Sequence, residues 1–345
     1  MRHTGTRHHR AVVATAVRTR NVRLRANPLR KKLVKTFFSP KSAAVRAAVL
    51  ASATVPILAA CGSGSDSETI TFAAIPAESS SSLESDYSNI TSLIEQETGL
   101  DVEFQNASDY AAVIEGQRAG QIDIASYGPF SYVIAKDSGV NIDAIAAPTS
   151  DPAQQPAYTS LAYVRADSDI KGLSDLRGRT VCFVDAASTS GYLVPMEGLM
   201  NEGIDLETDL EAVLAGGHDA SLLSLESGSC DAAFAHDTML NTLVTSGQVD
   251  DGALRSVWES EPIPEDPIAL NLDTLDPAVA EQISTVIREK ANKPALVAAG
   301  ICASEGECVL PEEIEYGYLP VDDTDFDAIR EICAATDAAA CHSIN

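Results

Sequence analysis

Residues 180–201 read TVCFVDAASTSGYLVPMEGLMN, a sequence that predicts a strand followed directly by a helix. Residues 180–184 are mostly apolar, as in a buried strand, and from Gly191 to Asn201 apolar residues recur at roughly helical spacing. Between these segments lie three small hydroxyl residues, Ser188, Thr189 and Ser190. The stretch therefore places hydroxyl side chains at the point where a strand passes into a helix.

This strand-to-helix junction has the chemistry of an anion-binding site. The first turn of a helix has unpaired N–H groups and a partial positive charge, and hydroxyl groups beside it add further donors. The alternative interpretation is an ordinary Ser/Thr cap, which satisfies the same N–H groups without a ligand. Both interpretations remain open for residues 188–190 taken alone.

Strands and helices alternate on both sides of this junction, which indicates an α/β protein with mostly parallel sheets. In such sheets ligands collect at the carboxyl ends of the strands. The expected strands are residues 70–75, 102–104, 122–126, 180–184, 211–215 and 231–235. The expected helices are residues 87–98, 109–118, 190–201, 219–226 and 238–245, with another that follows Pro129 and ends at Lys136.

The chain from Thr69 onward is about 277 residues long, enough for two lobes of ordinary domain size. We expect the first lobe to begin with residues 69–158 and the second to comprise residues 159–261. Residues 262–267 are rich in proline and form a stiff connector. The helices expected after this connector have no sheet of their own, so residues 262–345 are expected to return to the first lobe and to end in C-terminal helices.

The first 60 residues have the order of a secretory signal. They contain 13 of the 24 Lys and Arg residues and no Asp or Glu, and they end in a mostly apolar run before Cys61. Arg46 and Pro56 argue against a permanent membrane-spanning helix. We expect residues 1–60 to be a signal peptide with a basic N-terminal extension, Cys61 to carry a lipid as in a bacterial lipobox, and residues 61–68 to be a flexible tether. A basic nucleic-acid-binding arm is the alternative.

The remainder of the chain is strongly acidic. Without the first 60 residues, 11 Lys and Arg face 50 Asp and Glu, a formal net charge of −39. Such a charge argues against a nucleic-acid-binding surface and against binding to anionic membranes through surface charge.

Six cysteines follow Cys61, an even number in a chain with an export signal, so disulfides are expected. Six cysteines allow 15 pairings. The spacings favour Cys302 with Cys308 and Cys333 with Cys341, which leaves Cys182 with Cys230. Zinc is the competing interpretation, but the sequence contains no Cys-x-x-Cys motif, and we expect no metal and no cofactor.

Three further residues are candidates for a ligand site. Tyr110 begins a predicted helix, Tyr127 ends a predicted strand, and His218 precedes a predicted helix. Each also has a structural interpretation, as a packed tyrosine or a capping histidine. Ser190, His218 and an aspartate could suggest a hydrolase triad, but no serine lies in a Gly-x-Ser-x-Gly elbow.

Several short motifs occur in an order that resembles the phosphonate, phosphite and phosphate binding proteins of ABC importers, from about Thr69 to Ile301. The motifs are Asp109-Tyr110, Asp123-Ile124-Ala125 with Tyr127-Gly128, Ser188-Thr189-Ser190-Gly191 with Leu193-Val194-Pro195, Gly217-His218, and Ile263-Pro264 with Asp266-Pro267. The resemblance implies a two-lobed periplasmic-binding-protein fold of type II, with the ligand held in the cleft between the lobes.

The resemblance also implies roles for individual residues. The family's contacts to phosphonate oxygens fall on Tyr110, Ser188, Thr189, Ser190 and His218. Its interlobe tyrosine falls on Tyr158 and its cleft aspartate on Asp266. Members that bind aminoalkylphosphonates hold the amine with a carboxylate just after the strand at 231–235, for which Asp237 is the candidate. The cysteines and the loop between Cys302 and Cys308 depart from the family pattern.

Together with the export signal and Cys61, the resemblance predicts a solute-binding lipoprotein that captures an oxyanion of phosphorus and is not an enzyme. It would be a monomer on the outer face of the cytoplasmic membrane, with an ABC permease and an ATPase as partners. The alternatives are the same fold binding a sulfonate, a cofactor precursor or another solute, a sensor module that signals to a membrane protein, and an envelope hydrolase.

Overall fold

The computed structural model describes residues 69–77, 80–311 and 314–342. The expected signal peptide, the lipid attachment at Cys61 and the tether lie outside these residues. Within them, no helix combines the length and the apolar character needed to cross a membrane.

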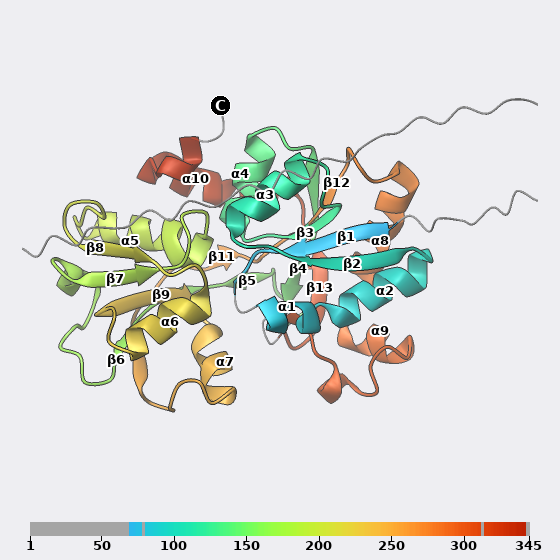
Figure 1. The fold of residues 1–345 in the computed structure, drawn as a ribbon. Helices are drawn as coiled ribbons and strands as arrows, with labels where there is room; N and C mark the ends of the chain where they lie inside the picture. Colours follow the sequence, from blue (N-terminus) through green and yellow to red (C-terminus); the bar gives the residue numbers. More distant parts are fainter. Residues whose placement is uncertain (1–68, 78–79, 312–313, 343–345) are drawn as a thin grey trace, which may run out of the picture. The chain divides into compact units, whose positions relative to one another are not determined.

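The first lobe is built on a six-stranded sheet with the order β13-β4-β12-β3-β1-β2 (Figure 1). Its strands are β1 (Thr69–Ala74), β2 (Asp101–Asn106), β3 (Ile124–Ser126), β4 (Ile142–Thr149), β12 (Ile268–Asn271) and β13 (Gly317–Pro320). Side chains alternate between the two faces of β1, as the period of a strand requires. Phe72 therefore packs with one core cluster and its neighbour Ala73 with another.

Helices cover both faces of this sheet. Tyr87, Ile90 and Ile94 pack with Phe72, whereas Val113 and Phe130 pack in the cluster around Ala73. The helices of the first lobe are α1 (Ser80–Asp86), α2 (Ser88–Thr98), α3 (Tyr110–Arg118), α4 (Pro129–Asp137), α8 (Pro277–Lys290) and α9 (Lys293–Ala298).

The second lobe has a five-stranded sheet with the order β10-β6-β9-β7-β8. Its strands are β6 (Ser160–Arg165), β7 (Thr180–Phe183), β8 (Glu211–Leu214), β9 (Ala232–His236) and β10 (Leu254–Glu259). Its helical segments are η1 (Leu173–Leu176), η2 (Thr189–Leu193), α5 (Val194–Asn201), α6 (His218–Glu226) and α7 (Met239–Thr245). The predicted alternation of strands and helices is confirmed in both lobes.

Both sheets are mixed, so the expectation of mostly parallel sheets is wrong. β1, β2 and β3 pair in parallel, as do β7, β8 and β9, but β12 is antiparallel to both of its neighbours and β6 is antiparallel to β9. The chain enters β6 and β12 directly after crossing between the lobes. These strands therefore start at the edge where the parallel strands end, and they run in the opposite direction.

Two short strands mark the crossings. β5 (Ala157–Tyr158) pairs antiparallel with β11 (Ile263–Pro264), apart from both large sheets. The chain after β11 returns to the first sheet, but it contributes two strands, β12 and β13, as well as helices. α10 (Asp327–Thr336) packs against α4 of the first lobe and also against α5 of the second, through Ile329 and Cys333.

Three disulfides are present, and all three match the predicted pairings: Cys182–Cys230, Cys302–Cys308 and Cys333–Cys341. The described residues contain no cluster of His, Cys, Asp and Glu that could hold a metal ion.

Candidate functional site

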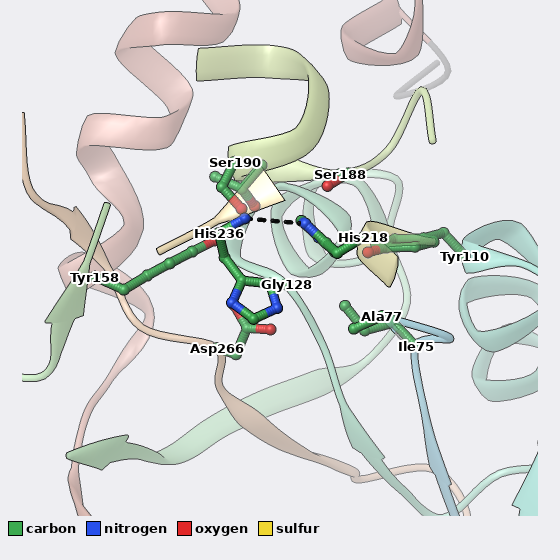
Figure 2. Close-up of a pocket in the computed structure, with 11 residues that line it drawn as sticks. Ile75, Ala77, Tyr110, Gly128, Tyr158, Ser188, Ser190, His218, His236 and Asp266 are labelled. Atoms are coloured by element: carbon green, nitrogen blue, oxygen red, sulfur yellow. Dashed lines mark hydrogen bonds between the residues drawn. The ribbon is translucent and has the colours of Figure 1, made fainter. Parts of the chain in front are cut away.

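A small cavity lies where residues of both lobes and of the crossing segments meet (Figure 2). Its volume is about 10 Å³, close to the space that one water molecule requires. The lining residues are Ile75, Ala77, Tyr110 and Gly128 of the first lobe, Tyr158 and Asp266 of the crossing segments, and Ser188, Thr189, Ser190, His218 and His236 of the second lobe.

Two hydrogen bonds join the lobes directly at this cavity. The backbone N–H of Phe130, in α4, donates to Thr189 Oγ1 at 2.8 Å. The backbone N–H of His218, in α6, donates to the carbonyl of Ala77 at 2.8 Å. Because each bond crosses from one lobe to the other, the structure shows the lobes closed over the cavity.

The Ser188–Ser190 turn connects β7 to the helix that continues into α5. All three side chains are buried. Ser188 Oγ accepts a hydrogen bond from the N–H of Gly191 at 3.1 Å, so this serine is indeed an N-cap. A hydroxyl that accepts one bond still has a proton to donate. The capping interpretation and the anion-site interpretation are therefore compatible at Ser188.

Gly191 fixes the path of this turn. A Cβ atom at this position would overlap the side chain of Val184. The backbone N–H of Val184 also donates to the Gly191 carbonyl at 3.1 Å. The turn is therefore folded tightly back on the end of the strand, which brings the three hydroxyl residues to the cavity.

His218 has a defined tautomer. Its Nδ1 accepts a hydrogen bond from the backbone N–H of His236 at 3.1 Å, so Nδ1 carries no proton. In the neutral ring the proton is then on Nε2. Burial, with a smaller effect of His236, holds the pKa of His218 well below its usual value. His218 is therefore a neutral imidazole whose remaining nitrogen is a hydrogen-bond donor.

His236 was not anticipated from the sequence. It is the last residue of β9, only 5% of its surface is exposed, and it lines the cavity. Its ring lies edge to face with that of His218, with 4.6 Å between the ring centroids. Burial lowers the pKa of His236 to about 4, although nearby Asp237 acts in the opposite direction. The signal available in the sequence was its place at the carboxyl end of a predicted parallel strand.

Asp237, the predicted partner for an amine, does not line the cavity. Its carboxylate accepts hydrogen bonds from the backbone N–H and the hydroxyl of Thr159, at 3.1 and 3.2 Å. Neighbouring residues at a strand end point to opposite sides. With His236 in the cavity, Asp237 is directed instead toward the segment that enters β6.

Tyr127 is also not part of the cavity. Its side chain is fully buried in the core of the first lobe, and its hydroxyl lies 3.5 Å from the carbonyl of Val113. Burial raises the pKa of this phenol. The structure therefore supports the alternative, a core tyrosine.

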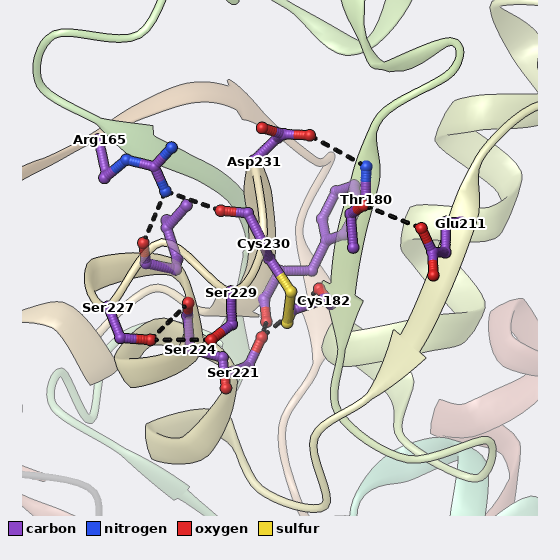
Figure 3. The surroundings of a disulfide bond; sticks show 12 residues. Arg165, Thr180, Cys182, Glu211, Ser221, Ser224, Ser227, Ser229, Cys230 and Asp231 are labelled. Atoms are coloured by element: carbon purple, nitrogen blue, oxygen red, sulfur yellow. Dashed lines mark hydrogen bonds between the residues drawn. A yellow bond between two sulfur atoms is a disulfide. The ribbon is translucent and has the colours of Figure 1, made fainter. Parts of the chain in front are cut away.

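The Cys182–Cys230 disulfide supports the second-lobe side of the cavity (Figure 3). Cys182 is in β7, which leads to the Ser188–Ser190 turn, and Cys230 lies just before β9, which ends at His236. In the same region the N–H of Thr180 donates to the Asp231 carboxylate at 3.1 Å. Covalent and hydrogen bonds thus hold together the two strands that deliver these cavity residues.

The cavity is polar but contains few charges. Among the lining residues that the structure describes there is no Lys or Arg, and Asp266 is the one carboxylate. Because both imidazoles are neutral, positive potential must come from N–H and O–H dipoles. Hydroxyls and helix N-termini of this kind suit a small anion that also carries a proton for the carboxylate.

The fold and this site define a class of protein: a two-lobed substrate-binding protein of the periplasmic-binding-protein fold, type II, with a polar cavity enclosed between its lobes. Residues 72–305 match the family described as the periplasmic phosphonate substrate-binding proteins of ABC transporters. The chain belongs to this family.

Individual relatives agree with this assignment. The chain is 40% identical to the phosphate-import protein PhnD of Mycolicibacterium smegmatis over 84% of its own length and 96% of that protein. It is 31% identical to the phosphonates-binding periplasmic protein of Escherichia coli over 58% of the chain and 60% of that protein.

Solved structures share the fold. A binding-protein component of a phosphonate ABC transporter from Pseudomonas aeruginosa superposes with a TM-score of 0.70 at 24% identity, covering 81% of this chain and 90% of that one. PhnD1 from Prochlorococcus marinus, solved with methylphosphonate, gives a TM-score of 0.66 at 18% identity, covering 79% of this chain and 100% of that one.

Proposed function

We propose that the cavity binds a small oxyanion of phosphorus, either a phosphonate, phosphite or phosphate, and that the protein delivers this ion to the permease of an ABC importer. The observation that carries the proposal is the Ser188–Ser190 turn. Three buried hydroxyl residues at the start of a helix face a cavity that both lobes close. The family of the chain and the phosphate-import and phosphonate-binding relatives support the same class of ligand.

The contacts can be assigned by the chemistry of each group. Ser188, Thr189 and Ser190 would hold the oxygens of the ion through hydroxyl and backbone N–H groups. Nε2 of His218 would add a donor from the same lobe, and the Tyr110 hydroxyl would add one from the opposite lobe. Each hydrogen bond to a charged group contributes about 1.5–3 kcal/mol.

The crossing segments contribute the other side of the site. Tyr158 belongs to β5, and Asp266 follows β11, so both side chains lie on the segments that join the lobes. We propose that the Asp266 carboxylate accepts the proton of a P–OH group. A ligand that contacts both lobes binds the closed arrangement more tightly than an open one, and it therefore favours closure.

Binding without catalysis is the role that we propose for these groups. Nδ1 of His218 accepts a hydrogen bond from a backbone N–H. In the neutral ring Nε2 therefore carries the proton, so it donates a hydrogen bond and does not accept a proton from a serine. The hydroxyl of Ser188 already caps the helix. We therefore assign His218 and Ser188 the role of fixed hydrogen-bond donors to a bound ligand.

For the rest of the chain we propose export through residues 1–60, lipidation at Cys61 and a tether of residues 61–68. The protein would then act as a monomer on the outer face of the cytoplasmic membrane, next to an ABC permease and its ATPase. We also propose lobe boundaries at residues 69–158 and 262–345 for the first lobe, and at residues 159–261 for the second.

Calorimetric titration tests the ligand class. The full chain is unfolded, freed of bound ligand, refolded and titrated with phosphate, phosphite, methylphosphonate, 2-aminoethylphosphonate and sulfate. We expect binding of at least one phosphorus ion in the micromolar range or tighter and much weaker binding of sulfate. Binding of sulfate alone, or of none of the five ions, would overturn the proposal.

A further inference from the structure

His236 has one ring nitrogen with a partner and one without. Nδ1 lies 3.0 Å from the hydroxyl of Thr238, two residues further along the chain. Nε2 is buried and, among the described residues, has no hydrogen-bond partner. Leaving a buried nitrogen unpaired costs about 1–3 kcal/mol. A group that lines a cavity and bears this cost is suited to a partner that enters the cavity.

The two histidines differ in how firmly their tautomers are set. A backbone N–H can only donate, so the bond from His236 N–H leaves His218 Nδ1 as an acceptor and its Nε2 as a donor. The Thr238 hydroxyl beside His236 can donate or accept. Nε2 of His236 can therefore donate to a P–O⁻ oxygen or accept from a P–OH group, according to what the ligand presents.

The imidazole of His236 also takes up space. Ser188, Thr189 and Ser190 provide donors to the cavity, and His236 lies on its boundary together with Tyr158 and Asp266 (Figure 2). A tetrahedral ion that places three oxygens against hydroxyl and N–H donors directs its fourth substituent to the remaining walls. His236 forms part of these walls, so a carbon chain on phosphorus would meet its imidazole ring.

We propose that His236 contacts the fourth substituent on phosphorus and restricts it to an oxygen, as P–OH or P–O⁻, so that the preferred ligand is inorganic phosphate. This inference rests on the proposed function and deepens it. A methyl group or a hydrogen at the same position would leave Nε2 unpaired, and an aminoethyl group would in addition collide with the ring. The expected order of affinity is phosphate, then phosphite and methylphosphonate, and last 2-aminoethylphosphonate.

The test uses the refolded full chain and two variants, titrated calorimetrically with phosphate, methylphosphonate and 2-aminoethylphosphonate. His236→Ala removes both the ring and its nitrogen, whereas His236→Gln keeps a hydrogen-bonding amide. We expect His236→Ala to bind phosphate about ten- to a hundredfold more weakly than the parent and to bind 2-aminoethylphosphonate no more weakly. His236→Gln should retain more of the preference for phosphate. His342→Ala, which changes an exposed histidine, is the matched control and should leave every affinity unchanged.

Two results would overturn the inference, and they are distinguishable. If the parent binds none of the three ions and no phosphite either, the proposed function fails and this inference fails with it. If the parent binds them but both His236 variants keep the same ratio of phosphate to aminoethylphosphonate affinity, the function stands and the role of His236 is wrong. His236→Gln keeps the test valid should the alanine variant not fold.

Discussion

Two strand-to-helix junctions, one in each lobe, both contain hydroxyl residues but supply very different surfaces to the cavity. In the second lobe, β7 is followed by the 184–190 junction, and its three hydroxyl residues all line the cavity. In the first lobe, the 126–130 junction lies at the end of β3, and among its residues only Gly128 lines the cavity. Ser126 instead accepts a hydrogen bond from the Tyr87 hydroxyl at 2.8 Å, and Tyr127 is in the core.

The length of the connection explains the difference. Pro129 starts α4 immediately after the strand, so Tyr127 is still held in the layer between the sheet and its helices. β7 ends at Phe183, and several residues follow before the helical turn that starts at Thr189. This longer turn can leave the sheet edge and present side chains to the other lobe. In these two junctions, a hydroxyl residue at a strand end reaches the cavity only where the turn carries it out of the core.

The largest expected effect concerns the crosslink that supports the 184–190 junction. The double change Cys182→Ala with Cys230→Ala should lower the free energy of unfolding by about 4 kcal/mol, because it opens a loop with a sequence separation of 48. Urea unfolding measures this. The matched control, Cys302→Ala with Cys308→Ala, opens a loop with a separation of 6 and should cost about 2 kcal/mol. Equal losses would show that loop closure is not the origin of the difference.

Acid should destabilise the second lobe through its buried histidines. The pKa of His236 is about 4 in the folded protein and 6.5 in the unfolded chain, so the unfolded state binds more protons between these values. Its contribution to stability is present above pH 6.5 and is lost as the pH falls toward 4, by about 3 kcal/mol. Urea unfolding of the parent and of His236→Gln from pH 7 to 4 measures it. The variant should lose less stability, and parallel curves would contradict the expectation.

Ligand affinity should depend on the hydroxyls of the 184–190 junction. Ser188→Ala should weaken binding of the best phosphorus ion by about ten- to a hundredfold, because a charge-assisted hydrogen bond is lost. Thr189→Ala should have a similar effect and should also lose the interlobe bond to Phe130. Thr189→Ser retains the hydroxyl and is the control. Unchanged affinity in both alanine variants would remove this junction from the site.

Selectivity should depend on Asp266, which is expected to accept a proton from the ligand. Phosphate monoanions and dianions carry a P–OH group, whereas sulfate at neutral pH has no proton to donate. Asp266→Asn should therefore weaken phosphate binding and reduce the penalty on sulfate, because an amide can donate as well as accept. The ratio of the two affinities, measured by calorimetry, should fall by about tenfold. An unchanged ratio would assign Asp266 a structural role in the connector.

The smallest effects are expected at the 126–130 junction. Tyr127→Phe removes a hydroxyl whose hydrogen bond to the Val113 carbonyl is long, at 3.5 Å, so it should cost about 1 kcal/mol of stability or less and leave ligand affinity unchanged. Tyr110→Phe is the matched comparison. This second tyrosine lines the cavity, and its loss of a hydroxyl should weaken binding about tenfold. Weaker binding in Tyr127→Phe would show that the first-lobe junction also contributes to the site.

Much of the fold could be predicted because it is a local property of the chain. The alternation of strands and helices, the Ser188–Ser190 turn and the short-range disulfides depend on residues close in sequence. The motifs of the family then identified most of the cavity, including Tyr158 and Asp266 on the two crossing segments. Five strands of the two large sheets were missed, namely β4, β6, β10, β12 and β13. β12, for example, is only four residues long, and it is a strand because β3 and β4 lie on either side of it.

The sequence by itself determined the α/β class, the acidic charge, the cysteine pairs and the hydroxyl turn, because composition, spacing and period are encoded locally. Only the tertiary structure decided that His236 faces the cavity while Asp237 bonds to Thr159, and that Tyr127 remains in the core. The physical reason is that the side toward which a strand-end side chain points depends on pairing with distant strands. Ser160 of β6 is paired with His236 across 76 positions of the sequence, and no local pattern contains that register.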